Sequence, residues 1–306
     1  MSMDINNEIK NELQGSGFLE EVKETRLPNS TVITGAALEK YESTYASLNP
    51  ETISRQADRV LKRLLELEHE IYNEREQRVY REALVVFLQE KYDTGQTSLH
   101  SFNSSEPEAD QFTEYPHLQE LFAELEEIYE TTDDFKEAFQ KILPLLYPAM
   151  DAISVSAQQS RRKRAGDSLR SHIENLLGKA GYTIDSVHSA GNGYLYQLHR
   201  HETDQEGSVY LSYLTTLRDR FRQSLSNGSI EDEDVPRFIM TGAGNSIFTS
   251  SRKSGVTDQK VSEITDEGFT LVVFETVKQN QHPDKKNVIS YTEFFAERLP
   301  TLVSPE

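Results

Sequence analysis

A short run of charged residues in the second half of the chain has side chains suited to reading DNA bases. Arg218, Asp219, Arg220 and Arg222 lie within the segment LTTLRDRFRQ, residues 214–223. Arginine can donate two hydrogen bonds to O6 and N7 of guanine, and a carboxylate can accept one from N4 of cytosine. By themselves these residues are more typical of an ion-paired turn on a helix surface. The surrounding sequence must therefore decide between such a turn and a DNA-reading site.

The elements that must position this run are a strand and a helix. Residues 208–214 alternate between large apolar and smaller polar side chains, which is the period of a half-buried strand. From Leu217 to Leu225 apolar residues recur at helical spacing, and Asn227-Gly228 is typical of a helix end. The sequence predicts a strand that leads directly into a helix bearing the charged run.

A second basic run stands before Ala165-Gly166, where the pattern predicts a turn. It consists of Arg161, Arg162, Lys163 and Arg164. Positive side chains at such a place favour contact with DNA phosphates, which position a protein on the duplex without reading its sequence. The alternative is an ordinary basic cluster on the surface.

Two blocks of the sequence resemble the type II restriction endonucleases of the EcoRII and CCGG-recognising group, which have the PD-(D/E)XK fold. One block is SRRKRAGDSLRSHIENLL, residues 160–177, and the other is the charged segment at residues 214–223. The resemblance covers roughly residues 155–300. It implies a mixed sheet flanked by helices, double-stranded DNA as the partner and a homodimer, because paired subunits suit palindromic sites.

The resemblance breaks down at the family's cutting residues. The family has a lysine before the two threonines, and Leu214 stands at that position. Its metal-binding aspartate, on the preceding strand, corresponds to Gly193, and a further carboxylate corresponds to Asn227. On the first core helix the family's early acid corresponds to Arg170, although Glu174 is retained as a candidate relic.

These departures predict a protein that binds DNA without cutting it. Phosphodiester hydrolysis on this fold needs Mg²⁺ held by oxygen ligands, and a lysine that stabilises charge on the phosphate. Leucine offers neither a charge nor a donor. We therefore expect no catalytic residues, no bound metal and no cofactor. The expected function is sequence-specific binding of CC/GG-containing sites, as a regulator or as a non-cutting partner in a restriction-modification or defence system.

Two other functions stay open at this level. The first is an active Mg²⁺-dependent type II endonuclease with a rearranged site, using Asp185, Glu174 or the acids of residues 202–206. The second is a protein-interaction scaffold that does not bind DNA. A separate metal-like cluster at His199 and His201 is more typical of an exposed hairpin turn than of a metal site.

Composition limits the class of protein. The chain of 306 residues has no cysteine, no apolar run of membrane length and an acidic N-terminus, so we expect a cytoplasmic protein without a membrane partner. Its net charge of −19, from 51 acidic and 32 basic residues, has the wrong sign for a generic nucleic-acid binder. Adaptation to high salt explains this charge better than loss of DNA binding, because the basic residues cluster in two runs.

The pattern along the chain predicts an α/β protein of two domains. Residues 1–148 contain amphipathic helical segments, with Pro144 and Pro148 expected to interrupt the last of them. Residues 149–306 alternate between strands and helices, which fits a restriction-endonuclease-like mixed sheet flanked by helices. The strands are expected at residues 182–187, 194–199, 208–214, 237–241 and 269–274.

Overall fold

The computed structural model describes residues 3–15, 27, 29–100, 116–217, 221–226, 235–245 and 255–303. The chain forms two compact units. We call the first, Met1–Pro28 with Asn73–Arg162, the helical unit, and the second, Asn29–Tyr72 with Lys163–Glu306, the sheet unit. Neither unit is one continuous stretch of sequence. The units therefore differ from the expected division between residues 148 and 149.

The interleaving follows from two long helices that contribute residues to both units. They are α4 (Pro50–His100) and α6 (Phe135–Lys179). The expected turn at Ala165-Gly166 is absent, because α6 continues through it. The expected interruption at Pro144 and Pro148 is absent as well. These prolines are four residues apart, so the backbone hydrogen bonds that they remove lie on one face of the helix.

The helical unit also contains α1 (Met3–Gly15) and α5 (Pro116–Thr131). Lys10 of α1 donates to Asp151 of α6 at 2.5 Å, and His117 Nε2 of α5 lies 2.9 Å from Glu8 of α1. Three residues separate α5 from α6, and Asp134 caps α6 by accepting from Glu137 N at 2.8 Å. Ion pairs therefore link α1 to both α5 and α6.

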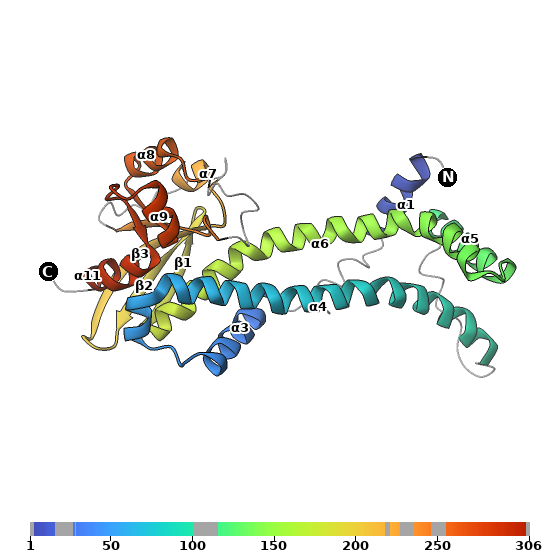
Figure 1. The fold of residues 1–306 in the computed structure, drawn as a ribbon, viewed down its shortest axis with the longest axis horizontal. Coiled ribbons are helices and arrows are strands. Elements are labelled where there is room, and N and C mark those ends of the chain that lie inside the picture. The colour runs from blue at the N-terminus through green and yellow to red at the C-terminus, as the bar shows by residue number, and fades with distance from the viewer. Residues whose placement is uncertain are drawn as a thin grey trace. The chain divides into compact units, whose positions relative to one another are not determined.

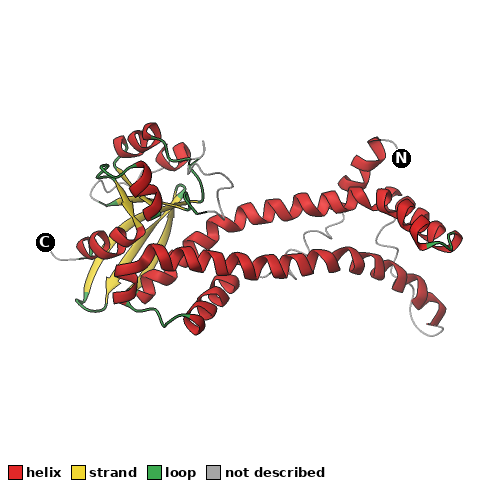
Figure 2. Cartoon of the chain, in the orientation of Figure 1, coloured by secondary structure: helices red, strands yellow, loops and turns green. Residues whose placement is uncertain are grey.

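The sheet unit is built on six strands in the order β1-β2-β3-β4-β5-β6. The first three, β1 (Tyr182–Ala190), β2 (Gly193–Arg200) and β3 (Gln205–Leu214), are antiparallel. The other three, β4 (Arg237–Thr241), β5 (Phe269–Val273) and β6 (Val288–Ser290), continue parallel to β3. The expected α/β class and mixed sheet are thus confirmed, and Figure 2 shows the strands among the helices of this unit.

Helices cover both faces of the sheet (Figure 1). One apolar cluster joins the sheet to α4, α6 and the C-terminal helices. The other joins the opposite face of the sheet to three short helices. The C-terminal helices are α10 (Tyr291–Glu293), the π-helix η1 (Phe294–Arg298) and α11 (Leu299–Leu302). The short helices on the opposite face are α7 (Phe221–Ser226), α8 (Asp258–Asp266) and α9 (Glu275–Gln281).

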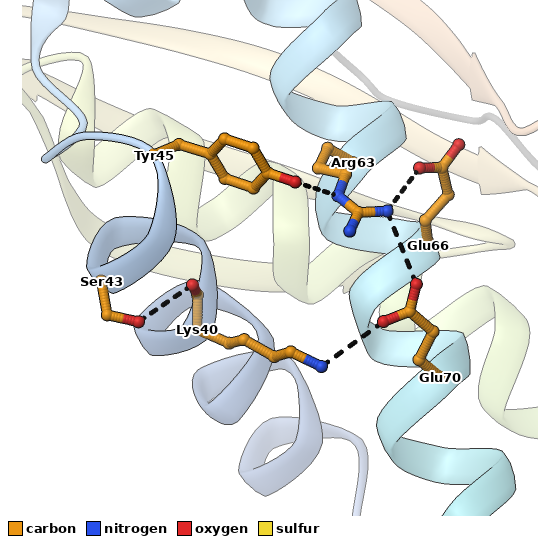
Figure 3. A network of polar contacts seen from close by, with 6 residues as sticks. All are labelled: Lys40, Ser43, Tyr45, Arg63, Glu66 and Glu70. Atoms are coloured by element: carbon orange, nitrogen blue, oxygen red, sulfur yellow. Dashed lines mark hydrogen bonds and ion pairs between the residues drawn. The ribbon is translucent and has the colours of Figure 1, made fainter.

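Two groups of polar contacts hold helices together in this unit. Partly buried Asp58 of α4 accepts from Glu275 N at 2.8 Å and from Thr292 N at 2.7 Å, which satisfies backbone donors in the first turns of α9 and α10. Helix α3 (Ser30–Thr44) and the residue that follows it are held to α4 by the network in Figure 3. There Arg63 Nε donates to Tyr45 at 2.9 Å, and Glu70 lies 3.4 Å from Lys40.

Candidate DNA-recognition site

The charged run expected to read DNA is anchored by the residues on either side of it. Leu217 and Phe221 are both 1% exposed and belong to the apolar cluster that includes α8 and α9. Between them Arg218, Asp219 and Arg220 lie outside the described residues. The expected helix from Leu217 is therefore described only as α7, which begins at Phe221.

Lys260 of α8 strengthens this anchoring. Its Nζ donates to the carbonyl of Leu217 at 2.5 Å and to the carbonyl of Gly255 at 3.0 Å, and it lies 6.0 Å from the centre of the Phe221 ring. One ammonium group thus contacts Leu217 and Phe221, the residues on either side of positions 218–220. Lys260 therefore links Leu217 and Phe221 to α8.

Arg222, also expected to contact DNA, forms a fork with α8. Its Nε and Nη2 donate to the carboxylate of Glu263 at 2.8 and 3.0 Å, while the side chain is 61% exposed. The hydrogen bond from Arg222 is the main reason that the pKa of Glu263 is lowered. Arg222 therefore fastens α7 to α8, and its contact with DNA stays a prediction.

Gly193, which the resemblance places at the family's metal-binding aspartate, has no room for a side chain. A Cβ atom built there would lie 2.9 Å from the carbonyl oxygen of Leu211 and closer still to the hydroxyl of Tyr210. Tyr210 is fully buried and donates to the carbonyl of Ala190 at 3.1 Å. Its ring fills the space that a carboxylate at position 193 would need.

Leu214 ends β3 and packs against the same apolar cluster as Leu217. It is paired in register with Thr241 of β4, and its carbonyl accepts from Gly242 N at 2.9 Å. Nearby, Ser212 donates to the carbonyl of Asn192 at 3.1 Å, which ties the β1–β2 turn to β3. The end of β3 therefore presents an apolar side chain where the resemblance expects a lysine. The last substituted position, Asn227, lies outside the described residues.

Glu174, the candidate relic acid, lies on α6 and contacts the other face of the sheet from the one that packs Leu214. Its Oε1 accepts from Arg170 Nε at 2.8 Å and from the hydroxyl of Tyr196 at 2.7 Å. Tyr213 donates in turn to the Tyr196 hydroxyl at 3.0 Å, and the Arg170 guanidinium stacks 3.7 Å from the centre of the Tyr194 ring. Tyr194 and Tyr213 pack against the cluster that contains α4 and α6.

The electrostatics of this group keep the tyrosines neutral. Burial, and then the nearby charge of Glu174, raise the pKa of Tyr196, while burial and the neighbouring Tyr196 hydroxyl raise that of Tyr213. Burial is the largest single influence on Arg170 and acts to lower its pKa, but the hydrogen bonds and charges of Glu174 and Tyr196 together outweigh burial and raise it. Glu174 therefore accepts hydrogen bonds that join α6 to β2, on the face of the sheet away from Leu214.

The basic run of α6 makes contacts within the protein. Arg161 Nε donates to Glu76 Oε2 at 2.6 Å, and the guanidinium of Arg164 lies over the ring of Tyr72 with Glu68 Oε1 3.7 Å away. Arg161 is half exposed, whereas Arg164 is largely buried. The side chains of Arg162 and Lys163 lie outside what the structure describes. Contact of this run with phosphate stays a prediction.

The two histidines of the β2–β3 hairpin each have a partner of their own. His199 Nε2 lies 2.8 Å from Asp204, and His201 Nε2 lies 2.6 Å from the hydroxyl of Thr183. The residues between β2 and β3 form the turn that the sequence predicts. Over the residues that the structure describes, no three histidine, aspartate or glutamate side chains group together in a way that could hold a metal ion.

Comparison with known proteins identifies the family. The sequence model for the family described as "EcoRII C terminal" matches residues 123–295, which is more than half of the chain. The chain belongs to the EcoRII C-terminal family. A search of curated proteins gives no match.

Solved structures with the same fold agree with this EcoRII C-terminal assignment. Metal-depleted Ecl18kI in complex with uncleaved DNA aligns with a TM-score of 0.64 at 12% identity, covering 99% of this chain and 85% of that chain. Metal-depleted Ecl18kI with uncleaved, modified DNA aligns with a TM-score of 0.63 at 12% identity, covering 95% and 86%. No described helix is both long enough and apolar enough to cross a membrane.

Sequence reasoning about this EcoRII C-terminal family member missed three side chains that shape the site. They are Tyr210, which fills the space at Gly193, and Lys260 and Glu263, which hold the flanks of the charged run. Lys260 is 43 residues from Leu217 and Glu263 is 41 residues from Arg222. The spacing of Lys260 and Glu263 on one helical face was the only available signal, and it does not identify their distant partners.

Proposed function

We propose that this protein binds double-stranded DNA sequence-specifically and does not cut it. It would read CC/GG-containing sites as a homodimer and act as a regulator or as the non-cutting partner of a restriction-modification system. Membership of the EcoRII C-terminal family and the likeness to Ecl18kI, which was captured on DNA, support DNA binding. The charged run at residues 218–220 supplies the residue types that read G·C pairs in the major groove.

The main support for the proposal that the protein does not cut DNA is the packing at Gly193. A hard cation such as Mg²⁺ needs carboxylate or other oxygen ligands, and Tyr210 occupies the space that such a ligand would take at this position. At the end of β3, Leu214 contributes neither a charge nor a donor to a phosphate. These residues do not fit the metal site that the family resemblance implies. Removing one charge-stabilising group from an active site typically costs about 10²–10³ in rate.

The rival proposal, an active nuclease with migrated acids, requires carboxylates close to the end of β3. Glu206 lies eight residues before Leu214 on the same strand, which corresponds to about 26 Å at about 3.3 Å per residue. Asp185 follows Ile184, which aligns through Leu198 with Gly207, about 23 Å along the sheet from Leu214. Glu174 packs on the other face. None of these acids supports a site beside Leu214.

Plasmid cleavage tests the non-cutting proposal. The purified full-length chain, incubated with plasmid in Mg²⁺ or Mn²⁺ from low to high salt, is expected to leave the supercoiled form intact. Both metals are needed because Mn²⁺ accepts less regular ligand sets than Mg²⁺. Nicking or linearisation at one reproducible sequence would overturn the proposal and favour a rearranged nuclease.

Gel-shift titration tests sequence-specific binding. Duplexes containing CCGG or CCWGG (W being A or T) are expected to bind more tightly than a duplex of the same length with the site scrambled. Replacing Arg218 or Arg220 with alanine should remove about 1–3 kcal/mol of discrimination each, or roughly 5- to 150-fold. Arg298→Ala, which removes an equal charge from an exposed position on η1, should leave the preference unchanged.

The outcome of this titration also separates a DNA reader from a scaffold. If the wild-type chain binds all duplexes equally, and the Arg218 and Arg220 variants match it, sequence-specific reading is wrong. If it binds none of them in low salt, where phosphate attraction is strongest, the protein-interaction scaffold becomes the better explanation.

A further inference from the structure

The first turns of α6 carry a stripe of large apolar side chains that is open to solvent. We call it the α6 stripe. Its members and their exposed fractions are Phe135 at 82%, Phe139 at 52%, Leu143 at 46%, Tyr147 at 64% and Met150 at 46%. The rings of Phe135 and Phe139 stack with their centres 6.1 Å apart. Large apolar side chains scattered singly over a surface are ordinary, but a contiguous row of them marks an interaction site.

The α6 stripe is one face of an amphipathic helix. At about 100° per residue its five members fall within roughly 120° of the helix circumference, along about 22 Å of helix. The ion pair between Glu137 and Lys141, at 2.8 Å, projects from the opposite side. Amphipathic helices of globular proteins normally bury the apolar face and expose the charged one. Here both faces are exposed, so the apolar face lacks a covering surface among the described residues.

We propose that the α6 stripe binds the same stripe on a second copy of this chain. Charge favours this partner. The chain as a whole carries −19, so most of its surfaces repel one another. The segment 135–158 contains two lysines, at positions 136 and 141, and two acids, at positions 137 and 151, and its net charge is zero. Two copies can meet at this segment without the repulsion that opposes contact elsewhere.

The available area is sufficient for a dimer of modest strength. A large aromatic side chain buries about 150–250 Å² when it is fully covered. At the exposed fractions of the α6 stripe, its five side chains offer on the order of 500 Å² per copy, or about 1,000 Å² for a symmetric pair. That is close to the lower limit for a specific protein–protein interface.

Antiparallel pairing fits the charges better than parallel pairing. The stripe extends eight residues before Leu143 and seven after it, so a two-fold axis close to Leu143 pairs its two ends with each other. Lys136 then lies beside Asp151 of the partner subunit, whereas parallel pairing would place Lys136 beside its own copy. Inside each chain Asp151 also binds Lys10, at 2.5 Å, and that contact leaves one carboxylate oxygen available.

This inference deepens the proposed function, because paired subunits are what a palindromic DNA site requires. The two can still fail separately. Dimerisation is measured without DNA, and sequence preference is measured by the arginine variants at positions 218 and 220. A chain that dimerises through the α6 stripe and ignores DNA sequence would refute only the DNA proposal.

Sedimentation equilibrium of the full-length chain tests the interface. We expect a dimer at micromolar concentrations for the wild type. Phe139→Glu and Tyr147→Glu each place a charge in the middle of the apolar contact, and each should weaken dimerisation by at least about 100-fold. Val155→Glu is the matched control, because Val155 is a 40% exposed apolar residue of α6 that faces away from the stripe. It should leave the dimer intact.

Engineered cysteines give an independent readout, since the chain contains no cysteine. Leu143→Cys lies at the proposed two-fold axis and should form a disulfide-linked dimer under mild oxidation, whereas Val155→Cys should not. Circular dichroism checks that each variant is folded. A wild-type chain that sediments as a monomer would overturn the proposal. So would a dimer that Phe139→Glu and Tyr147→Glu do not weaken and that Leu143→Cys does not cross-link. The second result would assign dimerisation to another surface.

Discussion

The sheet unit and the first turns of α6, which belong to the helical unit, differ in how far they bury their apolar residues. The sheet unit buries apolar side chains against both faces of its sheet, in one cluster with α4 and α6 and another with α8 and α9. In the helical unit, residues 135–147 of α6 include eight apolar side chains, and none of them is fully buried. In the sheet unit both apolar clusters are covered within one chain, whereas the proposed dimer would cover the first turns of α6.

The largest expected effect comes from exchanging one phenylalanine in each unit. Phe294 is fully buried, with its ring 5.1 Å from that of Phe238, so Phe294→Ala should lower the free energy of unfolding by about 3–5 kcal/mol. Phe135→Ala, at a site 82% exposed, should change it by no more than about 0.5 kcal/mol in a monomer. Urea unfolding followed by circular dichroism measures both. Similar losses for the two variants would contradict the contrast between the units.

A proline in α6 offers the next largest effect, with the opposite sign. Pro144 lies inside the helix and is exposed. Proline in a helix interior costs up to about 3 kcal/mol relative to alanine, because it removes a hydrogen bond and its ring crowds the preceding turn. Pro144→Ala should therefore stabilise the helical unit and slow amide hydrogen exchange in residues 135–150. Unchanged exchange there would show that the helix already compensates for the proline.

Buried charge in the sheet unit predicts a pH effect of intermediate size. Glu68 of α4 accepts from Ser168 at 2.5 Å and lies 3.0 Å from His172 Nε2, both on α6. Burial acts to raise the pKa of Glu68, but the contacts with His172, Ser168 and Arg164 outweigh burial and lower it below 4.5. Glu68→Gln should cost about 1.5–3 kcal/mol near pH 7.

The sign of this pH dependence follows from the lowered pKa. The folded protein holds the proton of Glu68 more weakly than the unfolded chain does, so the stabilisation is present above pH 4.5 and is lost as the pH falls through the folded-state pKa. The difference in melting temperature between wild type and Glu68→Gln should therefore shrink below pH 4.5. A difference that stays constant down to pH 3 would show that the charge of Glu68 contributes nothing.

The smallest expected effect distinguishes a structural Glu174 from a catalytic one. Tyr196→Phe removes the hydroxyl that links Glu174 to Tyr213, and it should cost about 0.5–1.5 kcal/mol without changing DNA binding. Thermal unfolding and the gel-shift titration measure the two properties. A loss of DNA affinity with unchanged stability would place this tyrosine group in the binding site.

Local patterns in the sequence were sufficient for much of the fold. The pattern of apolar residues predicted five strands close to their observed positions, because each strand has at least one face against an apolar cluster, and β4 and β5 have both. The two blocks of residues 160–177 and 214–223 were sufficient for the family. The short strand β6 (Val288–Ser290) was missed, since three residues are too few to show a period.

The errors and omissions arise where distant contacts decide the structure. Proline and glycine predict breaks locally, yet α6 continues through Pro144, Pro148 and Gly166. The basic run could be counted from the sequence, but only the fold shows Arg164 against Tyr72. Tyr210 and Gly193 meet across neighbouring strands, so their close approach could not be foreseen from either residue alone.

The fastening of Leu217 and Phe221 has a consequence for engineering. Both residues are held by burial and by Lys260, which lies on another helix. We therefore expect positions 218–220 to accept many different tripeptides with little change in the free energy of unfolding. A library randomised at these positions, selected on immobilised duplexes, should yield variants that melt at similar temperatures and prefer different sequences.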